Sequence, residues 1–412
     1  MPFLSGRVSY TRLRVSGDAP AEVDDAFLGI LSDHAFVESP APRVGVLESG
    51  FATGVHLLDT QFSYEKNGYG PVAHFALRVD SHQVPGDMKK ALRLIHEQSA
   101  VAASAKGFAT RADKADAKDL AAREMEEKLV NGQYRRSKLV PILWDLEKQL
   151  MYCAAGSTAV VEELAKKMRE AFSVKLQPLS AGAAAAEMMS ASGGSVRTFE
   201  DLRPSPFTPP PAGPREEDTG PGQDHNIPGI PWVAKAKDLR DFLGNEFLMW
   251  LLWKSQIGAI ETPDAYAIGD VNVTPWKSLD LDCAWAITGK TTLRQGGGET
   301  GDEGGSPLGV PECGKALATG KWPRKLGLML SNGENGFELT LQGDQMAVSG
   351  CQLPAVETAD SDRELADARI LFIRELDRTL EATYAAFLQA RVSSSWDTQR
   401  QAITKWLASR SR

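Results

Sequence analysis

Cysteine is scarce in this sequence of 412 residues. The four cysteines are Cys153, Cys283, Cys313 and Cys351, and no two of them form a C-x-x-C pair. This scarcity excludes a small fold held together by disulfides, and the spacing gives neither a zinc knuckle nor a dithiol redox motif. We therefore expect a reduced, cytoplasmic protein.

Long hydrophobic runs are also absent. The most apolar stretch, residues 247–253, reads FLMWLLW and is much shorter than the roughly 20 residues that span a bilayer. The first 17 residues alternate apolar and polar side chains as a strand does, and they lack the apolar core of a signal peptide. The sequence predicts no membrane partner and no export.

Recognisable catalytic motifs are missing as well. The sequence has no G-x-S-x-G elbow, and its six histidines form no H-x-x-x-H pair and no cluster with zinc-ligand spacing. Residues 289–291 (Gly-Lys-Thr) match only the tail of a phosphate-binding loop, because Ala284 stands where that loop has glycine. We predict a non-catalytic protein with no cofactor and no metal.

Asp280 and Asp282 keep one enzymatic alternative open. Alternation along a strand places both carboxylates on one face, where they could bind the metal ions of a nuclease. The competing interpretation is the solvated face of an ordinary strand. A metal-dependent DNA nuclease that uses this pair is the first alternative function.

The chain length corresponds to two or three domains. Residues 1–179 predict an α+β region, and residues 230–412 predict a second one with a β-meander and a long helix over residues 361–391. Between them, residues 180–229 are rich in Pro, Ala and Gly, which predicts a disordered insert. The expected fold class is α+β, with antiparallel sheets and packed helices in two folded regions.

Turn and capping residues mark elements of the first region. Asn67-Gly68 predicts the turn of a hairpin, and Asp87 predicts the N-cap of a helix that begins there. A second hairpin is expected over residues 139–154, followed by a helix capped by Ser157. Residues 100–128, rich in Ala, Lys, Asp and Glu, predict an exposed helix with little core.

Charge is distributed unevenly along the chain, whose formal net charge is −8. Residues 86–140 carry twelve Lys and Arg against eight Asp and Glu, whereas residues 200–226 carry two against six. Helical spacing gathers the basic residues of the first segment into rows that suit a phosphate backbone. The alternative is a solvated Lys/Glu-rich helix, which composition alone favours.

The order of elements resembles the recombination-associated protein RdgC family. The resemblance rests on the strand at residues 141–145 (Pro-Ile-Leu-Trp-Asp), the strand at 150–155, the helix with Ala-Lys-Lys-Met-Arg at 165–169 and the strand at 174–179. Tyr134-Arg135-Arg136 falls where that family has an aromatic-basic turn after a charged helical arm. The C-terminal half agrees more loosely, and the proline-rich insert and the glycine-rich stretch at 296–305 depart from the family pattern.

This resemblance implies a ring-shaped homodimer that encircles double-stranded DNA without sequence preference. Such proteins restrain RecA-driven strand exchange, so the implied partners are DNA, single-stranded DNA included, a second copy and RecA filaments at the nucleoid. Tyr134 is the implied dimer contact. The implied DNA contacts are Lys89, Lys90, Arg93, Arg111, Lys114, Lys118, Arg135 and Arg136.

A third hypothesis concerns the insert. Segments such as Pro209-Pro210-Pro211 favour an extended polyproline conformation that partner domains recognise. On this interpretation the protein is a scaffold that recruits partners through the Pro-rich insert.

Overall fold

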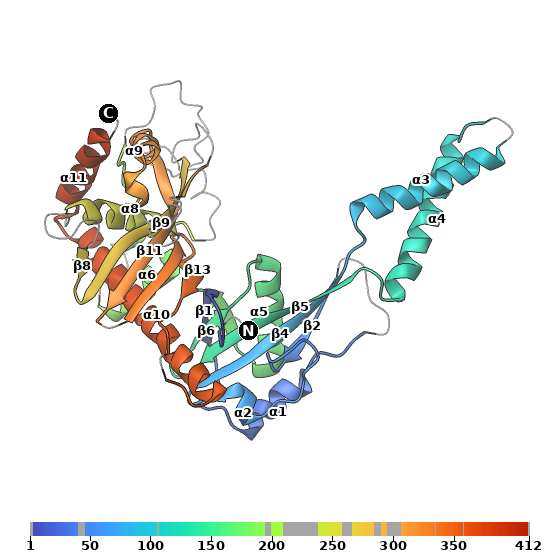
Figure 1. Ribbon diagram of the computed structural model, residues 1–412, viewed down its shortest axis with the longest axis horizontal. Coiled ribbons are helices and arrows are strands. Elements are labelled where there is room, and N and C mark those ends of the chain that lie inside the picture. Colours follow the sequence, from blue (N-terminus) through green and yellow to red (C-terminus); the bar gives the residue numbers. More distant parts are fainter. Residues whose placement is uncertain are drawn as a thin grey trace. The chain divides into compact units, whose positions relative to one another are not determined.

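The computed structural model describes residues 3–39, 46–104, 107–193, 199–208, 238–257, 266–283, 290–294, 306–333, 335–356 and 358–410 (Figure 1). The fold is α+β and is dominated by antiparallel sheet. The chain divides into two compact units. We call residues 15–176 the N-terminal unit, and residues 1–14 with 177–412 the C-terminal unit.

The N-terminal unit contains an antiparallel sheet in the order β6-β5-β4-β2, with the short strand β3 beside β4. Its strands are β2 (Leu47–Ala52), β3 (Gly68–Tyr69), β4 (Val72–His82), β5 (Arg135–Asp145) and β6 (Leu150–Cys153). Its helices are α1 (Asp25–Asp33), α2 (Tyr64–Asn67), α3 (Gly86–Ala103), α4 (Arg111–Val130) and α5 (Thr158–Phe172). The strand β7 (Lys175–Pro178) crosses the boundary between the units.

Aromatic side chains form the core of this unit. The ring of Phe172 on α5 lies 5.1 Å from that of Phe27 on α1 and 5.3 Å from that of Trp144 on β5. The hydroxyl of Ser157 accepts a hydrogen bond from the backbone N–H of Val160, so Ser157 caps α5 as the sequence predicts. The hairpin predicted over residues 139–154 is confirmed as β5 and β6.

The first hairpin turns at a different place from the prediction. Tyr69 pairs with Val72, so the turn falls at Gly70, whose φ of 59° is left-handed. Asn67 is instead buried and donates hydrogen bonds to the carbonyls of Thr53 (2.9 Å) and His74 (2.7 Å). These bonds anchor α2 against the sheet, and they outweigh the local preference of Asn-Gly for a turn.

The C-terminal unit contains a sheet in the order β10-β9-β11-β12-β13-β1, with β8 beside β9. Its strands are β1 (Val8–Ser16), β8 (Tyr266–Ile268), β9 (Val271–Cys283), β10 (Thr291–Arg294), β11 (Lys321–Asn332), β12 (Asn335–Gln342) and β13 (Ala347–Gln352). Its helices are α6 (Ala181–Ala191), α8 (Phe242–Ile257), the 3₁₀ turn η1 (Pro307–Gly309), α9 (Pro311–Ala318), α10 (Asp362–Val392) and α11 (Trp396–Ser409).

Two predictions for this unit are confirmed. The meander is formed by β11, β12 and β13, and Asn332 pairs with Asn335 at its first turn. The long helix is α10, which begins after Ser361 and packs its apolar side against α8, where the rings of Tyr384 and Phe247 lie 5.2 Å apart. The aromatic run at residues 247–253 is buried, as expected of a core element.

The domain boundaries differ from the prediction in two respects. The first strand belongs to the C-terminal unit, because Val8 and Tyr10 of β1 pair with Cys351 and Val348 of β13. Part of the expected insert is ordered: α6 is capped by Ser180, and the ring of Phe207, which is buried, lies 5.3 Å from that of Trp322. Small alanine side chains and the aromatic side chain of Phe207 are enough to pack this part of the chain, although its composition predicted disorder. Residues 209–229 lie outside the described residues.

Candidate nucleic-acid interface

The basic arm predicted over residues 86–140 is a helical hairpin at the end of the N-terminal sheet (Figure 1). Strands β4 and β5 pair along their full length, from Val72 opposite Asp145 to His82 opposite Arg135. The chain leaves the sheet after His82, forms α3 and α4, and returns at Arg135. We call α3, α4 and the turn between them the arm.

Few side chains hold the two helices of the arm together. Leu92 of α3 is buried, and so are Ala117 and Ala121 of α4, whose small side chains permit a close approach of the helices. The small core agrees with the prediction for this stretch. The capping residue of α3 was predicted wrongly: the helix begins at Gly86 after Pro85, and Asp87 lies within its first turn.

The second helix of the arm has a capping box. The hydroxyl of Thr110 accepts from the backbone N–H of Asp113 (3.3 Å), and the carboxylate of Asp113 accepts from the N–H of Thr110 (2.7 Å). Farther along α4, Glu124 accepts hydrogen bonds from Lys128 (2.7 Å) and contacts His96 of α3 (3.0 Å). The hydrogen bond from Lys128 and, to a lesser extent, the one with His96 lower the pKa of the Glu124 carboxyl.

A groove of about 530 Å³ lies between the two helices. Four of the predicted DNA contacts line it: Lys89, Lys90 and Arg93 from α3, and Lys118 from α4. The remaining lining is apolar and consists of Leu94, Ala121, Ala122 and Met125. The fold therefore brings basic residues that are distant in the sequence to one surface, which we call the arm groove.

The four basic side chains that line the arm groove, which we call its rim, differ in their ion-pair partners. Arg93 donates to Glu97 at 2.8 Å, one turn farther along the same helix. For Lys89, Lys90 and Lys118, which are exposed, the described part of the chain contains no ion-pair partner within 4.0 Å. Three cations of the rim are consequently available to an anionic ligand.

The other predicted contacts lie outside the groove. Arg111 and Lys114 are exposed in the first turn of α4, near the tip of the arm. Arg136 is exposed at the root, on β5. Arg135, also on β5, is half-buried and forms ion pairs with Glu38 and, at 3.7 Å, with the buried Asp80. Its charge is used to fix the root of the arm.

Tyr134, the predicted dimer contact, lies immediately before β5. It is half-buried and adopts a left-handed conformation with a φ of 66°. That conformation turns the chain from the end of α4 into β5. Its role at a subunit contact stays a prediction.

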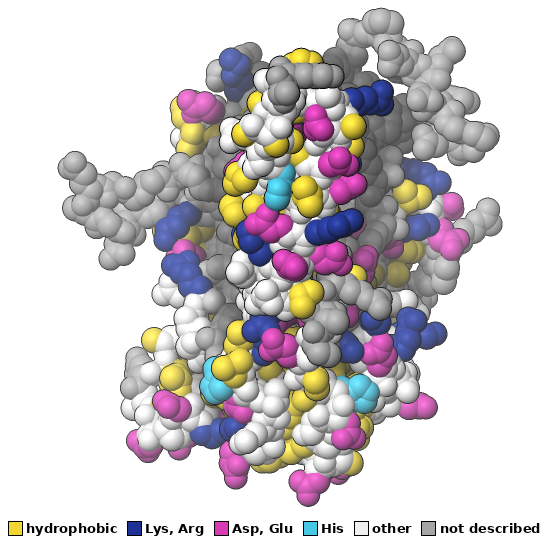
Figure 2. Space-filling model, turned by 90° about the vertical axis from the view of Figure 1, so that its right-hand side faces the viewer, with side chains coloured by type: hydrophobic (Ala, Val, Ile, Leu, Met, Phe, Trp, Pro, Cys, Tyr) yellow, Lys and Arg dark blue, Asp and Glu magenta, His cyan; other side chains and the backbone are white. Residues whose placement is uncertain are grey.

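Acidic residues also occupy the arm. Figure 2 views the molecule from the side on which the arm lies in Figure 1, and it shows Asp and Glu side chains among Lys, Arg and hydrophobic ones. Asp116, Asp119, Glu126 and Glu127 of α4 are exposed. The arm is therefore not uniformly basic, and the groove is the surface that four of its basic side chains line together.

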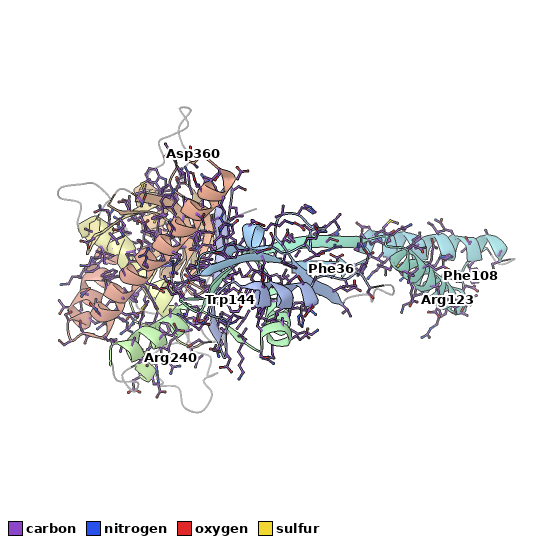
Figure 3. All side chains as sticks on the ribbon, turned by 90° about the horizontal axis from the view of Figure 1, so that it is seen from below. Phe36, Phe108, Arg123, Trp144, Arg240 and Asp360 are labelled. Atoms are coloured by element: carbon purple, nitrogen blue, oxygen red, sulfur yellow. The ribbon has the colours of Figure 1, made fainter. Side chains whose placement is uncertain are left out.

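Sequence reasoning missed the apolar side chains of the arm. Leu94 and Met125 form part of the groove, and Phe108 is 58% exposed at the turn between α3 and α4 (Figure 3). A signal was present: Leu94 follows Lys90 by four positions, and Met125 follows Lys118 by seven, so each pair shares a helix face. The periodicity of the basic residues alone does not reveal these apolar side chains.

The carboxylates of the nuclease alternative lie on β9 of the C-terminal unit. Asp280 and Asp282 are half-buried and alternate with the buried Leu279 and Leu281, as predicted for one strand face. Asp280 pairs in register with Lys325 of β11. Among the described residues, no group of three or more His, Cys, Asp or Glu side chains could hold a metal ion. Residues 284–289, which include most of the loose phosphate-loop match, lie outside the described part.

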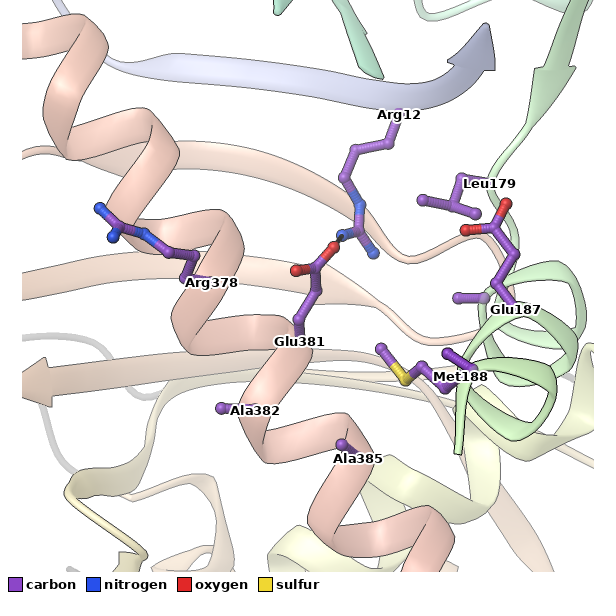
Figure 4. A pocket seen from close by; sticks show the side chains of 10 residues that line it. Arg12, Leu179, Glu187, Met188, Arg378, Glu381, Ala382 and Ala385 are labelled. Atoms are coloured by element: carbon purple, nitrogen blue, oxygen red, sulfur yellow. Dashed lines mark ion pairs between the residues drawn. The ribbon is translucent and has the colours of Figure 1, made fainter. Parts of the chain in front are cut away.

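A second cavity, of about 490 Å³, lies between α6 and α10 in the C-terminal unit (Figure 4). Arg12 of β1 points toward it and is fully buried, with its guanidinium 2.7 Å from the carboxylate of Asp377 and 3.9 Å from that of Glu381. Alanines and Met188 form most of the apolar lining. The cavity contains none of the predicted contacts, and Asp377 neutralises its deepest cation.

Comparison with known proteins gave no match: no protein-family model fits this chain, and no curated protein matches it. The resemblance to the RdgC family stays a prediction. Of the helices in the described ranges, none is both long enough and apolar enough to cross a membrane. The case for a function therefore rests on the residues of the arm.

Proposed function

We propose that this protein binds double-stranded DNA without sequence preference and that the arm is its DNA interface. The observation that carries the proposal is the arm groove, where α3 and α4 together present Lys89, Lys90, Arg93 and Lys118. Phosphate contacts from Lys and Arg supply affinity but carry no sequence information. Lysine amines on flexible stems suit such contacts, because they follow a backbone whatever the base sequence.

The proposed binding is electrostatic. Lys89, Lys90 and Lys118 add to Arg111, Lys114 and Arg136, which are exposed nearer the tip and the root of the arm. Arg135 contributes less, because Glu38 and Asp80 already neutralise it. We assign it to positioning the arm.

The resemblance to the RdgC family supports a more specific form of the proposal. In this form, two copies close into a ring around duplex DNA, with Tyr134 at a subunit contact. The ring restrains RecA-type strand exchange and so modulates recombination and replication, at the nucleoid in the cytoplasm. It acts without catalysis.

Equilibrium binding to two unrelated duplexes of equal length, over a salt series, tests the proposal. We expect equal affinities, with log K falling against log salt by about 0.9 for each phosphate neutralised. Affinity that is indifferent to salt contradicts electrostatic binding. The ring is tested separately: a closed circular plasmid should retain the protein longer than a short linear fragment with free ends.

The nuclease alternative is decided in the same samples. Incubation of end-labelled DNA with saturating protein and Mg²⁺ or Mn²⁺ should leave the DNA intact. Metal-dependent cleavage that Asp280→Asn abolishes would replace the proposed function with the nuclease.

A further inference from the structure

The arm groove has an apolar component that phosphate binding does not require. Leu94 is 43% exposed, and it lines the groove together with Met125, Ala121 and Ala122 and with the basic side chains of the two helices. Covering the exposed part of the Leu94 side chain would remove apolar surface from water and is therefore favourable. We call these four apolar residues the groove floor.

The charges around the groove floor are of one sign. Lys89, Lys90 and Lys118 have no ion-pair partner in the described ranges, and Arg93 is paired with Glu97 on its own helix. An occupant that complements this surface must present apolar side chains to the floor and carboxylates to the rim. Duplex DNA supplies the anions but offers no aliphatic surface at its phosphates.

Aromatic side chains are absent from the groove lining, which consists of lysines, an arginine, leucine, alanines and methionine. Stacking on nucleobases, the usual way of binding unpaired strands, depends on aromatic platforms. The groove floor is thus better matched to aliphatic side chains than to bases. The flexible side chain of methionine adapts to different partners, and the small alanines permit close approach of a third helix.

We propose that the arm groove is a docking site for an acidic amphipathic helix of a partner protein. Two packed helices with apolar side chains in the groove between them accept a third helix whose anchors recur at i, i+3, i+4 and i+7. The acidic flanks of that helix would meet Lys89, Lys90 and Lys118. The rim also belongs to the proposed DNA interface, so the helix and DNA should compete for it. This competition rests on the proposed function, whereas docking of the helix does not.

The test uses a fluorescent synthetic helix of about 18 residues, with Leu at the i, i+3, i+4 and i+7 positions, Glu at the positions flanking this face and Ala elsewhere. Its binding to the full-length protein is measured by anisotropy. The variant Leu94→Ser should weaken binding by about tenfold, since it removes the most exposed anchor of the floor. The matched control is Leu120→Ser, because Leu120 is 49% exposed on α4 and does not line the groove. It should bind the helix as the unmodified protein does.

Two further arms separate this inference from the proposed function. A helix with Leu replaced by Ser, and one with Glu replaced by Lys, should each fail to bind. Leu94→Ser keeps every charge of the rim, so its affinity for duplex DNA should stay within about twofold of the unmodified protein. Circular dichroism verifies that both leucine variants are folded.

The remaining outcomes decide the docking site and the proposed function separately. The site is refuted if the acidic helix does not bind while DNA does, or if Leu94→Ser and Leu120→Ser weaken the helix equally. A change in oligomeric state on Leu94→Ser without any helix present identifies a second copy as the occupant and overturns the proposal. Binding of the helix by a protein that does not bind DNA would leave the docking site standing and remove the proposed function.

Discussion

The imidazole Nε2 of His96 on α3 lies 3.0 Å from the carboxylate Oε2 of Glu124 on α4. The same carboxylate accepts from Lys128 one turn along α4, at 2.7 Å. The contact between His96 and Glu124 joins the two helices of the arm, whose shared core is small. It helps to fix the packing of α3 on α4 that brings Lys118 and Lys89 to one groove.

Replacing His96 with alanine should loosen the arm without removing a charge from the groove. We expect faster amide hydrogen exchange in α3 and α4, because one of the few contacts between them is lost. DNA affinity should fall by a few-fold, with an unchanged slope against log salt. His34→Ala is the control, since His34 caps α1 in the same unit. Unaltered exchange in the arm would show that the contact does not hold the register.

Asp377→Ala should destabilise the C-terminal unit strongly. Arg12 and Asp377 are both buried and lie 2.7 Å apart, so the substitution removes the buried partner of a buried guanidinium and leaves only the more distant Glu381. Breaking such a pair costs about 3–5 kcal/mol. Chemical denaturation checks this value, and Glu381→Ala is the control: that carboxylate is partly exposed, lies 3.9 Å from Arg12 and should contribute under about 1 kcal/mol.

Stability should fall in mild acid because of His74. Burial lowers the pKa of this histidine from 6.5 to about 4, since desolvation disfavours the imidazolium. Between these values the unfolded chain binds a proton that the folded chain does not. The stability present above pH 6.5 is therefore lost as the pH falls toward 4.

The size of this effect can be measured against a variant that does not titrate. From about pH 7.5 to about pH 5, the free energy of unfolding should fall by about 2 kcal/mol more in the unmodified protein than in His74→Phe. Equal pH dependence of the two proteins would exclude His74 as the source.

Local signals in the sequence predicted many elements of the fold. The Ser157 cap, the β5–β6 hairpin and the meander from β11 to β13 depend on nearby residues, and the structure confirms them. The displaced turn at Gly70 and the assignment of β1 to the C-terminal unit depend on distant contacts. Pairing of Val8 with Cys351 has no signature within a short window of sequence.

The candidate site was predictable only in part, for the same reason. Helical spacing grouped Lys89 with Arg93, and Arg111 with Lys114 and Lys118. It could not show that Lys118 and Lys89 line one groove while Arg111 lies toward the tip, because that depends on how α3 and α4 pack. Nor could it show that Glu38 and Asp80 neutralise Arg135.

The most direct test of the central claim is the salt dependence of duplex DNA binding after removal of the groove lysines. The variant Lys89→Ala/Lys90→Ala/Lys118→Ala is compared with Lys166→Ala/Lys167→Ala/Lys175→Ala, which removes the same charge from α5 and β7. From about 50 mM to about 200 mM salt, the groove variant should show a slope of log K against log salt that is shallower by up to about 3, with the control unchanged. Equal slopes in both variants would contradict the arm groove as the DNA interface.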